Sequence, residues 1–267
     1  MSILVMLLSA AAIIVFVKYG LVAAIDQLAG ALGWSAKTRG QATGFATSAP
    51  ELVALIAAGL SGVWDAGLWN IASSNIINAG LMILAVLRFG QIRELFNVRF
   101  ADEVGFAAVG VVTPLLLMRF ELDTSWAVVP ILLLVFLTYR IVDKRLNRPA
   151  VETSAQETVG SIPKGLALSA TALSLIAVAG IFLGDATRQV VNQMGVQPAL
   201  AGWLLGVVTS LPEVVTFFAV YGAARREGKL HLLEDTQEVL DNLAASNMSN
   251  TGLIYPVGLI VFLLVTG

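Results

Sequence analysis

The sequence predicts an all-α, polytopic membrane protein built from two inverted repeats, and three observations support this prediction. The first is composition, because 57% of the 267 residues are hydrophobic and only 13% are charged, whereas soluble domains carry about 25% charged residues. The second is a series of long apolar runs, and the third is a polar motif that occurs twice inside them. A mean hydropathy of +0.84 agrees with a chain that lies in a lipid bilayer.

The apolar runs predict about eight membrane spans, because a helix needs about 20 mostly apolar residues to cross a bilayer. The expected spans are residues 3–32, 38–60, 64–87, 103–119, 124–143, 163–194, 198–222 and 238–266. These runs are far too long for the strands of an outer-membrane β-barrel. The apolar N-terminus resembles a signal peptide but lacks a positive first region, so we interpret it as a helix.

The distribution of positive charge predicts the orientation. Thirteen of the 16 lysine and arginine residues fall on the cytoplasmic side if the N-terminus lies outside. The exceptions are Arg119 and Arg188, which fall outside, and Lys18, which lies within the first span. Because cytoplasmic loops are enriched in lysine and arginine, we expect an integral protein of the plasma (inner) membrane with its N-terminus outside.

Composition also limits the chemistry. A net charge of -2 leaves no basic surface for nucleic acid. The chain has no cysteine and a single histidine, His231, which excludes thiolate sites and centres with several histidines. The remaining ligands are mainly oxygen atoms, which suit hard cations such as Na⁺ and Ca²⁺. We therefore expect no cofactor and no nucleic-acid partner.

Polar residues of the first half recur in the second half. Eight residues of the first half are identical to the residues 162 positions later: Gln27, Gly33, Gly40, Gly44, Thr47, Ser48, Pro50 and Glu51. At an offset of 172, the set Asn70, Ala72, Ser74, Asn75 and Asn78 is repeated. This pattern predicts a duplicated unit. We divide the chain into a first repeat of five spans (1–145, motif 40–80), a cytoplasmic linker (146–162) and a second repeat of three spans (163–267, motif 202–252).

The two copies should have opposite orientations. The seventh span follows the second by an odd number of crossings, so the two spans cross the membrane in opposite directions. Inverted repeats are typical of secondary transporters, whose substrate sites lie near the membrane midplane between the halves.

Each copy places a proline beside a glutamate within an apolar span, at Pro50–Glu51 and Pro212–Glu213. Proline removes one helical hydrogen bond and frees a carbonyl one turn earlier. Irregular backbone at membrane depth is tolerated only where it packs in protein or lines a cavity. Two buried glutamates would repel each other unless one is protonated or cations lie between them. Their charge matches one Ca²⁺ or two Na⁺.

Hydroxyl and amide groups accompany both glutamates at helical spacing. They are Thr47, Ser48, Ser74 and Asn78 in the first copy and Thr209, Ser210, Ser246 and Asn250 in the second. Such residues can also serve as hydrogen-bonding contacts between helices. Both interpretations stay open for Asn70, Ser73, Asn75, Asn242 and Asn247.

These motifs resemble the paired α-repeats of the sodium/calcium exchanger family, within the cation/Ca²⁺ exchanger superfamily. The matching segments are 47–51 (TSAPE) with 70–78 (NIASSNIIN), and 209–213 (TSLPE) with 242–250 (NLAASNMSN). The resemblance implies an antiporter, not an enzyme, that exchanges Na⁺ for Ca²⁺ by alternating access. It implies that the first and sixth helices slide across a core bundle.

The resemblance also implies twelve ligand positions and a site shared by both ions at the two glutamates. The ligands would be the carbonyls of Gly44 and Gly206 and the side chains of Thr47, Ser48, Glu51, Ser74, Asn78, Thr209, Ser210, Glu213, Ser246 and Asn250.

The chain departs from the family pattern in three ways. Ala46 and Val208 replace a usual glycine, and both Asn78 and Asn250 are neutral where relatives commonly place one aspartate. The missing acid weakens a role for K⁺. Only 17 residues follow Asn250, so the family's usual last two helices have no counterpart. We expect a shortened member or an incomplete chain, with a partner subunit or a homo-oligomer left open.

Two alternatives remain at this point. One is H⁺-coupled exchange of Ca²⁺ or another cation, with one glutamate cycling a proton. The other is a membrane subunit that binds ions without transporting them.

Overall fold

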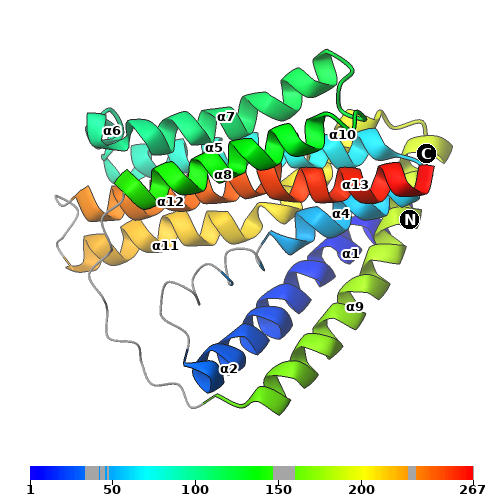
Figure 1. Cartoon of the computed structure of the whole chain (residues 1–267), viewed down its shortest axis with the longest axis horizontal. Coiled ribbons are helices and arrows are strands. Elements are labelled where there is room, and N and C mark those ends of the chain that lie inside the picture. The colour runs from blue at the N-terminus through cyan, green and yellow to red at the C-terminus, as the bar shows by residue number, and fades with distance from the viewer. Residues whose placement is uncertain (34–41, 43–45, 47, 147–159, 228–232, 267) are drawn as a thin grey trace.

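A computed structural model describes residues 1–33, 42, 46, 48–146, 160–227 and 233–266. Within these residues the regular structure is helical and contains no strand (Figure 1). Five helical stretches among them are long and apolar enough to cross a membrane: Ser2–Leu32, Trp64–Phe89, Val98–Arg119, Ile162–Gln193 and Val239–Thr266. Shorter apolar helices span Ala49–Leu60 and Pro198–Thr209. The predicted all-α, polytopic fold is confirmed.

Each predicted span contains at least one described helix, and the seventh is divided into two helices at Ser210. The first half of the chain forms α1 (Ser2–Phe16), the π-helical η1 (Val17–Leu21), α2 (Val22–Leu32), α4 (Ala49–Leu60), α5 (Trp64–Phe89), α6 (Ile92–Leu95), the 3-10 helix η2 (Val98–Phe100), α7 (Ala101–Arg119) and α8 (Val128–Leu146). The second half forms α9 (Ile162–Arg188), the π-helical η3 (Gln189–Gln193), α10 (Pro198–Thr209), α11 (Leu211–Glu227), α12 (Leu233–Ser249), the π-helical η4 (Asn250–Ile254) and α13 (Tyr255–Thr266).

The start of the fifth span differs from the prediction. We expected it at residue 124, but α8 begins at Val128. Residues 120–127 form turns instead, in which Ser125 accepts the backbone N–H of Val128 at 3.0 Å. Hydropathy alone could not find this boundary, because Trp126 and Ala127 continue the apolar run outside the helix.

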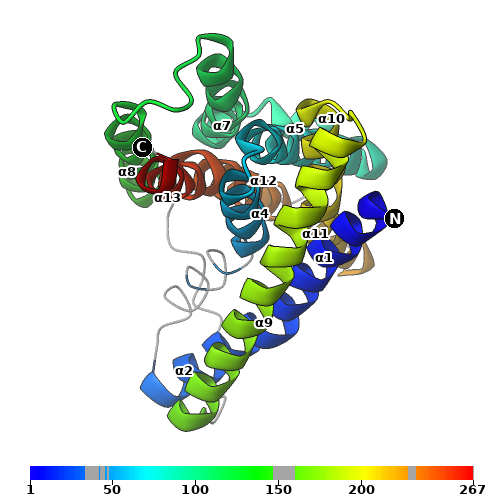
Figure 2. The ribbon, with the colours of Figure 1, turned by 90° about the vertical axis from the view of Figure 1, so that its right-hand side faces the viewer.

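The first helices of the two predicted repeats pack side by side and run in opposite directions (Figure 2). Ser2 at the start of α1 donates a hydrogen bond to Gln189 of η3 at 2.8 Å. At the other end, Leu28 of α2 lies against Gly165, near the start of α9. This antiparallel packing is the arrangement expected for inverted repeats.

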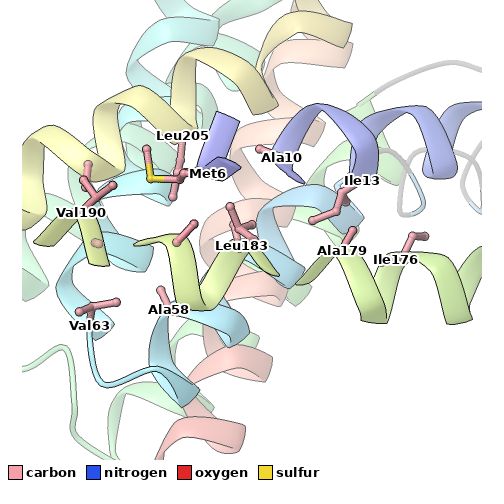
Figure 3. Close-up of a cluster of buried hydrophobic side chains, with 14 of the residues drawn as sticks. Met6, Ala10, Ile13, Ala58, Val63, Ile176, Ala179, Leu183, Val190 and Leu205 are labelled. Atoms are coloured by element: carbon pink, nitrogen blue, oxygen red, sulfur yellow. The ribbon is translucent and has the colours of Figure 1, made fainter. Parts of the chain in front are cut away.

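A buried apolar cluster joins this helix pair to the rest of the molecule. Met6, Ala10 and Ile13 of α1 contact α9 near Ala179 and Leu183 (Figure 3). The cluster continues into α4, α5 and α10. Many of its members are alanines, which allow helix backbones to approach closely in a membrane.

Two helices form the centre of the bundle. In the apolar windows of Trp64–Phe89 and Val239–Thr266, 56% of the residues are buried inside the protein, compared with 28% in the other three spans. These central helices carry the second half of each predicted motif. The two central helices contact each other, and α4, α7, α10 and α11 pack around them. Both run roughly along the long axis of the molecule in Figure 1.

Candidate functional site

The two Pro-Glu segments produce similar backbone breaks at equivalent residues. Ser48 immediately precedes α4 with φ -87° and ψ 2°. Ser210 separates α10 from α11 with φ -84° and ψ 0°. Both serines occupy the sparsely populated bridge region. Pro50 lies in the first turn of α4, where its missing N–H costs no helical hydrogen bond. The break that the sequence predicts in the second repeat is confirmed.

Both glutamates are buried just after these breaks. Glu51 is 1% exposed and Glu213 is 7% exposed. Ser74 donates its hydroxyl to Oε1 of Glu51 at 3.2 Å, and Ser246 donates to Oε1 of Glu213 at the same 3.2 Å. The Glu51 carboxylate also interacts electrostatically with Glu213. Each of the two equivalent carboxylates thus accepts the hydroxyl of an equivalent serine.

Further hydrogen bonds cross from one repeat to the other. The hydroxyl groups of Ser74 and Ser210 lie 3.0 Å apart. Asn78 donates its Nδ2 to the hydroxyl oxygen of Ser246 at 3.3 Å. Each contact joins a predicted ligand of the first repeat to one of the second. The bonds form two groups, one around Glu51 with Ser74 and Ser210 and one around Glu213 with Ser246 and Asn78.

Four buried oxygen atoms of predicted ligands find no hydrogen-bond donor in the part of the chain that the structure describes. They are Oε2 of Glu51, Oε2 of Glu213, Oδ1 of Asn78 and Oδ1 of Asn250. Buried polar atoms in proteins are normally hydrogen-bonded, so a group of unsatisfied acceptors calls for an explanation. Carboxylate, amide and hydroxyl oxygens are the ligands that hard cations prefer. This set of oxygen atoms therefore suits a hard cation.

Comparison with known proteins gives the family. A sequence model described as sodium/calcium exchanger protein matches residues 2–143 and 164–265. The chain belongs to the sodium/calcium exchanger family. It is therefore a membrane transporter of the cation/Ca²⁺ exchanger class. No curated protein and no solved structure matches it.

The carbonyl of Gly206, a predicted ion ligand, accepts hydrogen bonds from neighbouring residues of the exchanger. This oxygen accepts the backbone N–H of Ser210 at 3.0 Å and the hydroxyl of Thr209 at 3.4 Å. Thr209 also lies 3.3 Å from Oδ1 of Asn70, to which it donates. In this conformation the carbonyl of Gly206 therefore stabilises the backbone at the break between α10 and α11. Its equivalent Gly44, like Thr47, lies outside the described residues.

Asn75 and Asn247, for which both interpretations were open, contact the backbone of neighbouring helices in the exchanger. Asn75 donates to the carbonyl of Gly110 in α7 at 2.8 Å, and Asn247 donates to the carbonyl of Asn75 at 3.3 Å. Sequence reasoning missed Gly110 and Thr251, which complete this contact. Thr251 has alanine as its counterpart in the first repeat, so a comparison of the repeats could not find it.

Proposed function

We propose that this exchanger moves Na⁺ and Ca²⁺ in opposite directions, and that both ions use one site between Glu51 and Glu213. The observation that carries the proposal is the group of buried acceptor oxygens, on Glu51, Asn78, Glu213 and Asn250, that find no donor among the described residues. A bare cation is the partner that satisfies such oxygens. Membership of the family supports the same class of transport.

We infer that the remaining predicted positions complete the coordination. They are Gly44, Thr47, Ser48, Ser74, Gly206, Thr209, Ser210 and Ser246. Ca²⁺ takes about 6–8 oxygen ligands, and no pair of glutamates supplies that number. Hydroxyl groups can rotate to present a lone pair, so Ser74 and Ser246 can turn from the carboxylates towards an ion.

Charge gives a reason for exchange. An ionised carboxylate is costly inside a membrane, and two that interact also repel each other. One Ca²⁺ or two Na⁺ neutralises both, so binding of one cargo excludes the other. An empty, doubly charged site would resist transfer into a sealed conformation. Return of the carrier therefore requires the competing ion, which makes the transport an exchange.

The helix pair formed by α1, η1, α2 and α9 is the element that we expect to move. It contacts the bundle through an apolar surface with many small side chains, among them Ala10, Ala54, Ala58, Ala179 and Ala186. Such a surface interlocks less than one built from leucine and phenylalanine. We infer that the pair slides over it to open the site to one side at a time.

We assign the exchanger to the plasma (inner) membrane with its N-terminus outside. The assignment rests on the 13 of 16 basic residues that this orientation leaves in the cytoplasm. Residues 146–162 would then connect the repeats inside the cell. Reaction of single introduced cysteines at position 2 and at the exposed position 164 with an impermeant reagent tests this orientation, because only the first should react in intact cells.

The direct test is Ca²⁺ uptake into proteoliposomes driven by an outward Na⁺ gradient. Wild-type protein should accumulate Ca²⁺, whereas E51Q and E213Q should each fall to the level of empty liposomes. E121Q is the matched control, because Glu121 is exposed in the turn before α8, and it should transport normally. Full transport by either E51Q or E213Q would refute the site.

The same vesicles separate the alternatives. Uptake driven by a pH gradient without Na⁺ would indicate H⁺-coupled exchange instead. Ca²⁺ binding without counterflow under any gradient would indicate an ion-binding subunit.

A further inference from the structure

We propose that α7, which carries no part of the duplicated motif, positions Asn250 for ion binding through the main-chain carbonyl of Gly110. Asn75 and Thr251 transmit this effect, so Gly110, Asn75 and Thr251 are positioning residues. The inference rests on the proposed function, because it assigns the support of one ligand of that site.

The chain of contacts begins at a proline. Pro114 lies inside α7, and because it has no N–H, the carbonyl of Gly110 loses its usual helical donor. Two side chains from other helices replace that donor. Asn75 of α5 donates its Nδ2 to this carbonyl at 2.8 Å, and Thr251 of η4 donates its hydroxyl at 2.8 Å. Both side chains are fully buried.

A third hydrogen bond, between Asn75 and Thr251, fixes the orientation of the Asn75 amide. Nδ2 of Asn75 lies 3.0 Å from the hydroxyl oxygen of Thr251, to which it also donates. With its nitrogen held in this way, Asn75 must direct Oδ1 to the opposite side. There it accepts Nδ2 of Asn250 at 2.9 Å.

The orientation of Asn250 follows from that bond. Its nitrogen is engaged by Asn75, so its Oδ1 is the atom that remains without a donor among the described residues. If either amide were reversed, two donors or two acceptors would face each other. The carbonyl of Gly110 therefore determines, through two amides, that an oxygen of Asn250 is presented at the site.

The second repeat is built differently from the first at this point. Asn250 starts the π-helical η4, which includes Thr251, whereas Asn78 and Ala79 lie within the regular helix α5. A π-helical turn adds a residue to the helix and is frequent at functional sites. Asn78 donates to Ser246 instead. The two asparagines thus have different supports, although the motif segments that they end share five of nine residues.

Close packing keeps α7 at the distance that these bonds need. A Cβ added at Gly110 would lie 2.7 Å from Cβ of Asn247 and 3.0 Å from its main-chain oxygen. Any larger residue would push α7 away from the central helices. Glycine at 110 and proline at 114 together provide a carbonyl that is both accessible and free of a helical donor.

Two substitutions test the inference without touching a proposed ligand. T251A removes one donor and introduces the residue of the first repeat. P114A supplies an N–H that competes for the carbonyl of Gly110. Each should raise the half-saturating Ca²⁺ concentration about five- to tenfold, the size expected from one buried hydrogen bond. The maximal rate for each folded transporter should change less than twofold.

The controls separate positioning from general damage. T251S keeps the hydroxyl and should recover most of the affinity lost in T251A. P130A replaces an exposed proline near the start of α8 and should match wild type. The amount of folded protein is measured by size-exclusion chromatography for every variant, and P114A is judged only together with T251A.

Two results would overturn the inference. One is wild-type half-saturation in both T251A and P114A, and the other is an equal loss in T251A and T251S. Na⁺-driven uptake by the wild-type protein judges the proposed function separately. If wild type showed no such uptake, equilibrium binding of radioactive Ca²⁺ to the purified proteins would still compare the variants.

Discussion

Asn75 and Asn247 donate hydrogen bonds to each other's main-chain carbonyls. Nδ2 of Asn75 lies 3.5 Å from the oxygen of Asn247, and Nδ2 of Asn247 lies 3.3 Å from the oxygen of Asn75. The two residues occupy equivalent positions of the repeats, so the pair of hydrogen bonds is symmetric about the pseudo-two-fold axis. The axis that relates the repeats therefore passes between them, where α5 and α12 cross.

This contact predicts that Asn247 stabilises the fold. In N247A, the carbonyls of Asn75 and Ala107 lose an amide donor, which should cost about 1–3 kcal/mol of unfolding free energy. N242A is the control, because Asn242 is exposed on the same helix and its loss should change stability by less than about 0.5 kcal/mol. Thermal unfolding in detergent measures both, and equal melting temperatures would contradict the assigned role.

The equal serine–glutamate bonds predict similar effects of S74A and S246A. Each variant removes a hydroxyl that lies 3.2 Å from a glutamate and that we propose as an ion ligand. Each should raise the half-saturating Ca²⁺ concentration by up to about tenfold. Transport assays over a range of Ca²⁺ concentrations give these values. A large effect of one variant with none of the other would mean that only one glutamate faces the ion.

The packing of α10 on α5 predicts that Gly206 tolerates no side chain. A Cβ there would lie 2.1 Å from the hydroxyl of Ser73 and 3.0 Å from the backbone nitrogen of Ser74. G206A should therefore destabilise the protein by about 1–3 kcal/mol. S73A removes the nearest atom, so the double variant should recover part of this loss. If the double variant is no more stable than G206A alone, another contact limits the approach.

Asp123 predicts a dependence of stability on pH. It lies in the turn between α7 and α8, where partial burial, assisted by the charge of Asp65, raises the pKa of its carboxyl. The folded state therefore favours the protonated form. The ionised form costs stability at neutral pH, and this cost disappears as the pH falls through the raised pKa.

D123N should remove that cost. The variant should be slightly more stable than wild type at neutral pH, and the difference should vanish below pH 4, near the ordinary range of aspartate. The effect is small because the group is partly solvated. Melting temperatures recorded between pH 3 and pH 8 test it, and an increasing advantage of D123N at low pH would contradict the assigned direction.

The sequence was sufficient for the helices and for the backbone breaks. Apolar runs report which segments avoid water, and each predicted span contains a helix of the described residues. The Pro-Glu pairs marked the positions where α4 begins after Ser48 and α11 begins after Ser210, because proline is favoured in the first turn of a helix. These are local properties that a single chain reveals.

The hydrogen bonds that orient Asn78 and Asn250 could not be predicted from the sequence. The motif segments that end at Asn78 and Asn250 share five of nine residues, yet one asparagine lies in a regular helix and the other starts a π-helical turn. The difference comes from Thr251 and from the carbonyl of Gly110, which lies far away in the chain. Such contacts depend on how α7 packs against the central helices, and no local pattern encodes that packing.

The most direct test of the shared site is equilibrium binding of radioactive Ca²⁺ to the purified protein as Na⁺ is added. The account predicts that Na⁺ displaces Ca²⁺ competitively, and that E51Q and E213Q each lose most of the binding. Ca²⁺ that stays bound at saturating Na⁺, or wild-type binding in both variants, would contradict it.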